Sequence, residues 1–262
     1  MALYRPIAIN HSHDSENRIH SDDVARQYGF TGALVPGVAV FGHMTHPLSE
    51  TFGADWLDHS QVSLRLLKPA YHGDRLAIAL EPTGVHSYRI ECRNDSGVLL
   101  AILTANVGNE LPPVDPRAAT PGAAEAPPRE LIHWDAIAID EPFAAVDWQP
   151  TEAENRDYTE QIADDLPLYR SGVVHPHLLQ HWCNAVLVRR FVLPAWIHVG
   201  TDMTFRRVLR VGDHVQIRSI PIEKWRHKGH EFIKLYVVFA IAGNAAVEAS
   251  HTAIYKVAPK AA

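Results

Sequence analysis

The chain has 262 residues, of which 47% are hydrophobic and 21% are charged, so its composition is that of a globular protein and not of a disordered or fibrous one. A formal net charge of −6 gives no basic surface that would indicate nucleic acid or anionic lipid as a partner. The only cysteines, Cys92 and Cys183, exclude a disulfide framework and lack metal-ligand spacing, which favours a reducing compartment.

The first residues, MALYRPIAINHSHD, contain no basic segment followed by an apolar one, so we expect no signal peptide. The longest apolar stretches, such as Leu235–Gly243, fall far short of the roughly 20 residues that a membrane-spanning helix needs. These two observations predict a cytoplasmic protein without a membrane partner.

One segment differs sharply in composition from the rest. Residues 109–130 are rich in proline and alanine and contain almost no large apolar side chains. Such a stretch cannot bury enough surface to offset its ordering entropy, and its prolines favour an extended, stiff spacer. We interpret 109–130 as a linker between an N-terminal unit, residues 1–108, and a C-terminal unit, residues 131–262.

The two units repeat each other. When the sequence is shifted by 138 or 139 positions, several short features coincide in the same order. The matches are Glu16–Arg18 with Glu154–Arg156, Val35–Gly37 with Val174–Pro176, His59 with His198, and Gly73-Asp74 with Gly212-Asp213. The nearly constant offset indicates an internal duplication.

The N-terminal unit begins with a predicted short strand at Ile7–Ile9. The run Gly37–Thr51 is apolar most of the way round, as a buried helix would be, and Pro36 stands where a helix start favours proline. Strand patterns with turn signals between them follow. They cover Gln61–Leu67, Arg75–Glu81, Tyr88–Cys92 and Val98–Val107.

The C-terminal unit repeats this order. A short strand at Ala144–Val146 is followed by a predicted buried helix at Pro176–Phe191. The later predicted strands are Thr201–Val208, His214–Pro221, Glu231–Ala242 and Ala245–Val257. The repeated order predicts an α+β fold with two tandem units, each a curved antiparallel sheet wrapped around one central helix. Each unit alone leaves a sheet edge unpaired, so we expect the two sheets to join.

The stretch Asp14–Gly42 resembles the MaoC-like, R-specific enoyl-CoA hydratases. That signature reads Asp-x-Asn-Pro-(aliphatic)-His, and Asn17, Ile19 and His20 stand at its Asn, aliphatic and His positions. The residues that follow in register are Ala25, Gly29-Phe30, Gly32 and Pro36-Gly37. Outside this window the similarity is only architectural. The resemblance implies a double hot-dog fold and a hydratase or dehydratase acting on an acyl thioester.

Water addition to an α,β-unsaturated thioester needs a base, a proton donor to the α-carbon and donors to the carbonyl oxygen. The resemblance implies that His20 is the principal acid/base and that Asn17 orients the loop or the water. It also implies that the backbone N–H of Gly37 receives the thioester oxygen at the positive end of the central helix, where the missing Cβ allows close approach.

The sequence departs from the signature at one important place. Ser15 stands where the family has its catalytic Asp, and a serine hydroxyl without a partner is no competent base. Asp14 is the candidate carboxylate if the loop is shifted by one residue. In the second unit Asn155 is retained but Tyr158 replaces the histidine, so we expect that unit to carry no hydratase site.

The other residues expected at the substrate are Ser15, Pro36, Gly42, His43 and His59. Each assignment has a structural alternative. Asp14, Ser15 and Asn17 could form a turn and helix cap before residues 21–28, and Pro36-Gly37 could be only a helix start. His20, His43 and His59 could be histidines that merely satisfy neighbouring polar groups.

No cofactor or metal is required by these chemistries. His11-x-His13 and His175-x-His177 supply two imidazoles each, whereas metal sites usually have three or four ligands. Phosphate-loop, dinucleotide and Gly-x-Ser-x-Gly patterns are missing from the sequence. Trp225–His230 has the pattern of a basic hairpin tip. This segment could bind the phosphates of coenzyme A, but we favour the interpretation that it is only an exposed turn.

Three classes of function therefore stay open. The first is a hydratase or dehydratase of acyl-CoA or a similar thioester, in fatty-acid or polyketide metabolism. The second keeps the fold and changes the reaction. It is a thioesterase, or a dehydratase, isomerase or cyclase with a non-CoA substrate. A thioesterase would use a carboxylate, and the only acid on the first helix, Glu50, lies near its far end, which argues against this reaction. The third is a non-catalytic acyl-binding or assembly protein. Because hot-dog proteins often assemble further, a homodimer is a reasonable expectation.

Overall fold

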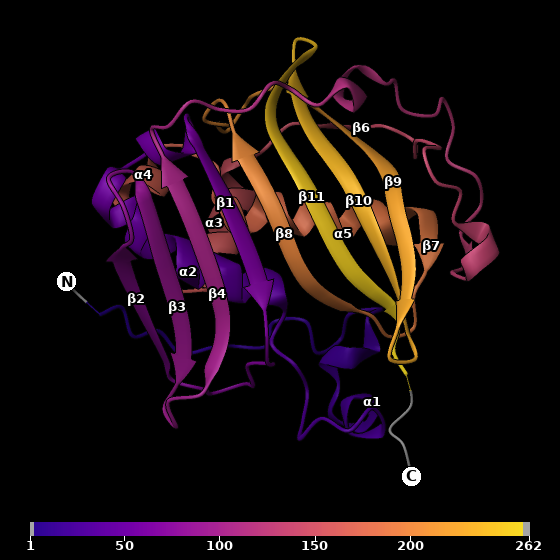
Figure 1. Cartoon of the computed structure of the whole chain (residues 1–262), viewed down its shortest axis with the longest axis horizontal. Coiled ribbons are helices and arrows are strands. Elements are labelled where there is room, and N and C mark those ends of the chain that lie inside the picture. Colours follow the sequence, from indigo (N-terminus) through magenta and orange to yellow (C-terminus); the bar gives the residue numbers. More distant parts are fainter. Residues whose placement is uncertain (1–2, 259–262) are drawn as a thin grey trace.

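A computed structural model describes residues 3–258 of the chain. Its main feature is a nine-stranded sheet in the order β2-β3-β4-β1-β8-β11-β10-β9-β6, with the helices α2 and α5 lying against the same side of it (Figure 1). The first half of the sheet consists of β1 (Ser60–Leu66), β2 (Leu76–Pro82), β3 (Ser87–Asn94) and β4 (Leu99–Val107). The second half consists of β6 (Val146–Trp148), β8 (Ile197–Phe205), β9 (Val215–His227), β10 (His230–Ile241) and β11 (Asn244–Lys256).

The two halves join through β1 and β8, which pair antiparallel with Ser60 opposite Phe205 and Arg65 opposite Gly200. This confirms the predicted union of two sheet edges. Gly200 allows the close approach, because a Cβ there would stand 2.7 Å from the Leu64 carbonyl oxygen. The repeated order of one buried helix followed by antiparallel strands is confirmed in both halves.

The central helices are α2 (Gly37–Phe52) and α5 (Pro176–Arg190). In α2, every residue from Val38 to Ser49 is buried, which agrees with its apolar pattern on all sides. The two helices contact each other, and Trp56, just after α2, packs edge-on against Phe205 of β8 with ring centroids 5.1 Å apart. One hydrophobic core therefore runs through both halves.

Shorter elements lie before the central helices and in the connection. They are α1 (Asp22–Gln27), α3 (Glu152–Gln161), α4 (Pro167–Arg170), β5 (Glu130–Leu131) and β7 (Phe191–Val192). The predicted strand at Ile7–Ile9 is wrong, because Tyr4 and Ile7 make only isolated bridges to the edge of the sheet. Its predicted counterpart at Ala144–Val146 is displaced toward the C-terminus, into β6.

The proline-rich segment 109–130 lies against the second half of the sheet. Its short 3-10 helix, Pro116–Ala119, is capped by Asp115, whose backbone N–H donates to Glu248 on β11 at 2.9 Å. Ala118 packs with Tyr236 of β10. Backbone and side-chain contacts thus hold part of this segment in place.

Two further expectations concern single features. The Trp225–His230 stretch is a hairpin tip as predicted, with Lys228 and Gly229 at positive φ between β9 and β10. Between residues 3 and 258, no helix has the length and apolar character that crossing a membrane requires.

Candidate functional site

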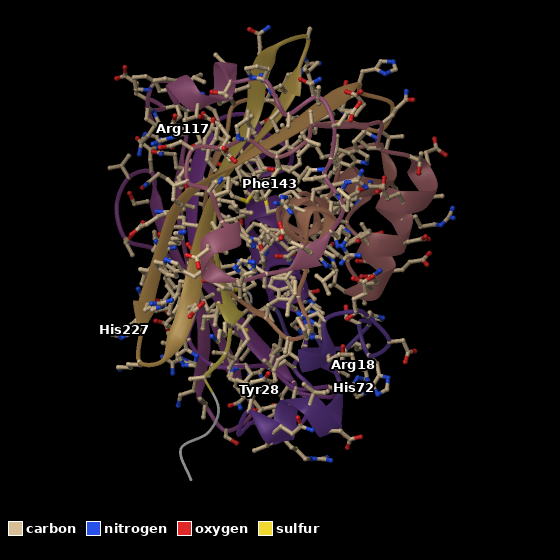
Figure 2. The ribbon with its side chains drawn as sticks, turned by 90° about the vertical axis from the view of Figure 1, so that its right-hand side faces the viewer. Arg18, Tyr28, His72, Arg117, Phe143 and His227 are labelled. Atoms are coloured by element: carbon tan, nitrogen blue, oxygen red, sulfur yellow. The ribbon has the colours of Figure 1, made fainter. Side chains whose placement is uncertain are left out.

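A cavity of about 380 Å³ lies where the two halves meet. Its walls come from the loop around His20, the start of α2 at Gly37, the end of β1 at Leu66, the start of β8 at His198 and the end of β11 at Ile254. Figure 2 shows Arg18 and Tyr28, which flank this loop, toward the same end of the molecule as His227 in the β9–β10 hairpin. Both halves of the chain therefore build the cavity.

Both ring nitrogens of His20 have a hydrogen-bond partner, and one of them can accept a proton. Its Nδ1 lies 2.7 Å from the Leu34 carbonyl oxygen, which can only accept, so Nδ1 carries the ring proton. Nε2 then holds a lone pair and lies 3.3 Å from the Asn17 amide nitrogen. Burial lowers the pKa of His20, which leaves the ring neutral near pH 7 and able to accept a proton.

Asn17 fastens the His20 loop to the second half of the chain. Its Oδ1 accepts the backbone N–H of Trp196 at 3.1 Å, and its Nδ2 donates to the Trp196 carbonyl oxygen at 3.0 Å. The same Oδ1 accepts the N–H of Ile19 at 3.4 Å and caps the 3-10 helix Arg18–His20. The side chain therefore caps a local element and also positions His20 against β8.

Gly37 is the first residue of α2, where backbone N–H groups have no acceptor within the helix. A Cβ at this position would collide with Leu66 and stand 3.0 Å from Nδ1 of His198. Glycine thus lets the Leu66 and His198 side chains pack closely against the positive end of the helix. Pro36 lines the same wall of the cavity.

The acidic residues of the loop do not reach His20. The Asp14 side chain is 100% exposed and contacts Nδ1 of His13 at 3.1 Å. Glu16 binds Arg129 at 2.6 Å, and Ser15 donates its hydroxyl to the Asn17 carbonyl oxygen at 3.3 Å. Because the loop turns sharply around residues 12–16, the predicted one-residue shift does not carry Asp14 into the cavity, and Ser15 does not line it.

Three other predicted substrate contacts also lie outside the cavity. Gly42 faces away from it, since a Cβ there would stand 2.8 Å from Cδ1 of Ile162, and His43 is buried one residue further along α2. His59 is exposed just before β1, whereas the cavity touches the opposite end of that strand at Leu66. These three assignments are therefore corrected.

The cavity has polar atoms that sequence reasoning missed. Among the described residues, Oδ1 of Asn184, Nε1 of Trp196 and Nδ1 of His198 are buried without a hydrogen-bond partner. All three belong to lining residues from the second half. Burying an unpaired polar group costs about 1–3 kcal/mol, so these atoms favour a ligand with polar groups of its own. Only the match of His198 with His59 drew attention to any of them.

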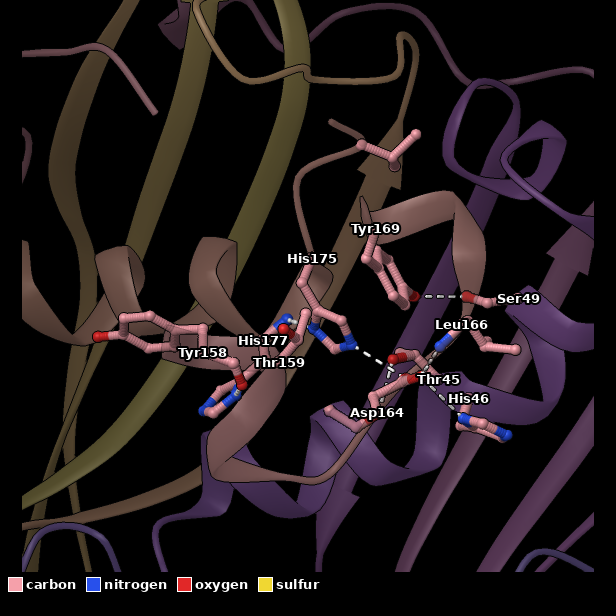
Figure 3. Close-up of polar contacts among 12 residues, drawn as sticks. Thr45, His46, Ser49, Tyr158, Thr159, Asp164, Leu166, Tyr169, His175 and His177 are labelled. Carbon is pink, nitrogen blue, oxygen red and sulfur yellow. Dashed lines mark hydrogen bonds and ion pairs between the residues drawn. The ribbon is translucent and has the colours of Figure 1, made fainter. Parts of the chain in front are cut away.

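The corresponding polar residues of the second half, Asn155, Asp164 and His175, are buried. Asn155 accepts the N–H of His175 with its Oδ1 at 2.8 Å and donates to the Val173 carbonyl oxygen at 2.9 Å. Figure 3 shows Asp164 between two histidines, with Nε2 of His175 at 3.2 Å and Nδ1 of His46 at 3.1 Å. The Asp164 and His175 side chains are 0% exposed. A cavity of about 850 Å³ borders this region and is lined in part by Asn155, Asp164 and Tyr169, but neither His175 nor His46 lines it.

Asp164 remains charged despite its surroundings. Burial by itself raises the pKa of this carboxyl, but hydrogen bonds from His175 and His46 outweigh that effect and hold its pKa well below the usual range. His46 also stacks on Tyr4 with ring centroids 3.8 Å apart. The cluster therefore links α2 of the first half to the loop before α5. No group of three or more metal-ligating side chains within 3–258 is arranged to hold a metal ion.

The sheet, its two central helices and the inter-half cavity define a double hot-dog protein. Solved structures with the same fold include a protein from Chloroflexus aurantiacus named as a MaoC domain protein dehydratase (TM-score 0.60, 12% identity, covering 100% of this chain and 95% of that one). A Mycobacterium tuberculosis protein described as having a double hot-dog fold has the same TM-score and identity, covering 97% of this chain and 95% of that one.

A structure from Lactobacillus plantarum titled as an oleoyl thioesterase matches with a TM-score of 0.54 and 10% identity, covering 99% of this chain and 98% of that one. No protein-family model matches the sequence, and the search of curated proteins gives no match. At these identities the likeness establishes the fold, which both dehydratases and thioesterases use.

Proposed function

We propose that this protein is a hydratase or dehydratase that interconverts an α,β-unsaturated acyl thioester and its β-hydroxy form. The observation that carries the proposal is that His20, with Nε2 unprotonated, and Gly37, at the start of α2, line one cavity. A base and an oxyanion donor are the two groups that this reaction needs most.

In hydration, His20 Nε2 takes a proton from water while the water oxygen forms a bond to the β-carbon. The π electrons move toward the thioester carbonyl, and the Gly37 N–H at the positive end of α2 stabilises the enolate-like oxygen. His20 then returns a proton to the α-carbon, which balances the addition of one water. Dehydration follows the same steps in reverse.

His20 acts in this scheme without a carboxylate. The resemblance implies an Asp beside the His, and here Asp14 and Glu16 both point elsewhere. Burial lowers the pKa of His20, so its protonated form is a stronger acid than an exposed imidazolium and returns its proton more readily. A single histidine can therefore take up and give back the proton.

Thioester hydrolysis is the alternative reaction. Hot-dog thioesterases use a carboxylate, and the described lining of the cavity contains no Asp, Glu, Ser or Cys. Glu50 stands near the far end of α2 and is exposed. The residues at the cavity therefore favour water addition over hydrolysis.

The test is a time course of the purified protein with trans-2-enoyl-CoA esters of short and medium length, alongside His20→Ala. Loss of the conjugated-enoyl absorbance together with a product heavier by one water supports the proposal if the variant is at least about 100-fold slower. Release of free CoA without hydration would replace it by a thioesterase. Unchanged thioesters would move the search to non-CoA substrates or a binding role.

A further inference from the structure

A second imidazole lies directly beside the expected oxyanion position. His198, at the start of β8, is only 6% exposed and lines the cavity. Its Nδ1 has no hydrogen-bond partner among the described residues and faces the start of α2, 3.0 Å from where a Cβ on Gly37 would be. A buried ring nitrogen without a partner, at the site where a carbonyl oxygen is expected, points to a ligand contact.

His198 is the outer member of a buried chain of three side chains. Its Nε2 lies 2.8 Å from the Thr201 hydroxyl, which lies 2.8 Å from Nδ1 of His251 on β11. The two imidazole rings stack with centroids 4.4 Å apart. Since Thr201 has one hydroxyl hydrogen, it donates to one histidine and accepts from the other, and the protons along the chain are therefore coupled.

Both rings are uncharged at neutral pH. Burial lowers the pKa of His198 to about 3 and that of His251 well below its usual value. Each ring thus carries one proton, and the direction of the Thr201 hydroxyl decides where the His198 proton is. If Thr201 donates to Nε2, that proton is on Nδ1 and faces the cavity.

Each direction leaves one ring N–H without an acceptor in the protein, on Nδ1 of His198 in this one and on Nε2 of His251 in the other. Only His198 lines the cavity, where a ligand can supply the acceptor. When Thr201 donates to Nε2 of His198, it accepts from the Nδ1–H of His251. Among these three side chains, the one atom without a partner away from the cavity is then Nε2 of His251, which carries no proton. The opposite direction would bury an N–H of His251 with no acceptor, and orphaned buried N–H groups are rarer than unpaired acceptors.

We propose that His198 is a second oxyanion donor, whose Nδ1–H binds the substrate's carbonyl oxygen together with the Gly37 N–H. The inference rests on the function proposed above and extends it to a residue of the second half. A neutral imidazole can stabilise the developing negative charge without titrating near pH 7.

Matched substitutions separate the two ring nitrogens. In His198→Asn, the side-chain amide can present a donor close to the position of Nδ1, whereas His198→Gln extends it toward Thr201 and leaves the Nδ1 position empty. We expect His198→Gln to lower kcat about 100-fold with little change in KM, because removal of one oxyanion donor has an effect of this size. His198→Asn should recover at least about ten-fold of that loss.

A measurement on the unsubstituted protein gives a second readout that does not depend on folding of the variants. Histidine ¹⁵N spectra with butanoyl-CoA, which has no double bond to hydrate, should show His198 protonated at Nδ1 and the Nδ1 signal shifted on binding. Equal kcat in the wild type and His198→Gln, or protonation of His198 at Nε2 in the bound state, would overturn the inference. If the wild type hydrates no enoyl-CoA, the proposed function fails, whereas the butanoyl-CoA spectra still decide whether His198 binds a thioester.

Discussion

The segments that precede α2 and α5 share an asparagine and differ in what they enclose. Asn17 bridges to the backbone of Trp196 in the other half and also contacts Nε2 of His20, which lines the cavity. Asn155 bonds instead to backbone groups next to its own helix, including those of Val173 and His175. The equivalent asparagine therefore ties the His20 loop to the other half in one copy and fixes the start of its own helix in the other.

The first residues of the two central helices also differ between the copies. α2 begins at Gly37, which has a free N–H and no Cβ, whereas α5 begins at Pro176, which has no N–H to donate. In the second copy Tyr158 stands in the place of His20 and packs edge-on against His177 at 4.9 Å. The second copy therefore has neither an imidazole nor a helix-start N–H at these positions, and Asn184, Trp196 and His198 from this half complete the wall of the cavity.

The largest effect expected is acid unfolding. Burial lowers the pKa of His43 and His181 to about 4, and it also lowers the pKa of five further histidines. These are His20, His175, His177, His198 and His251. Between pH 6.5 and about 4 the unfolded chain binds protons that the native state excludes, so the free energy of unfolding falls as the pH falls.

Each such histidine can contribute a slope of about 1.4 kcal/mol per pH unit. Urea unfolding at several pH values should therefore show full stability above pH 6.5 and a loss of several kcal/mol by about pH 5. A free energy of unfolding that stays constant over this range would show that these histidines are solvated in the native state.

Next in size is removal of the buried carboxylate in the second copy. Asp164→Ala leaves His46 and His175 facing an empty site, and removal of one partner from a buried charged cluster costs about 3–5 kcal/mol. The neighbouring Asp165 is exposed, so Asp165→Ala is the matched control and should change the free energy of unfolding by at most about 0.5 kcal/mol. Equal effects of the two substitutions in chemical denaturation would contradict a structural role for the cluster.

Gly37→Ala sharpens the comparison at the helix starts. The new Cβ would collide with Leu66 and approach Nδ1 of His198, where the substrate oxygen is expected. Alanine suits a helix better than glycine, so we expect the fold to persist while kcat/KM for an enoyl-CoA falls about 100-fold. Unchanged kcat/KM would place the thioester oxygen elsewhere in the cavity.

The smallest effect expected is that of Asp14→Asn. The Asp14 carboxylate is fully exposed and contacts only His13, so its loss should leave the hydration rate within about two-fold. A large loss of rate, with unchanged thermal unfolding, would mean that the loop rearranges to bring this carboxylate to His20 when substrate binds.

The sequence predicted those features that depend on local pattern. Periodicity indicated both central helices and most strands, and the spacing of Asn17, His20 and Gly37 indicated three residues that the structure brings to one cavity. Asn184 was missed, and His198 was noted only for its match with His59, because both approach the cavity from the second half, more than 140 residues further along the chain. No local spacing records such a contact.

The repeat also misled in one respect. His59 and His198 are equivalent in the duplication and each lies close to the start of a strand. Because β1 and β8 pair antiparallel, with Ser60 opposite Phe205, equivalent positions lie at opposite ends of the pair. His198 therefore faces the cavity, while His59 lies far from it.

We propose, as the central claim, that His20 of the first copy carries the acid/base chemistry, whereas the Asp164 cluster carries stability. The most direct test measures the enoyl-CoA hydration rate and the free energy of unfolding of His20→Ala and Asp164→Ala side by side. We expect His20→Ala to lose about 1,000-fold in rate while its stability stays within about 1 kcal/mol, and Asp164→Ala to lose stability while its rate, measured where it is folded, stays within a few-fold. A hydration rate that survives in His20→Ala and disappears in folded Asp164→Ala would contradict the account.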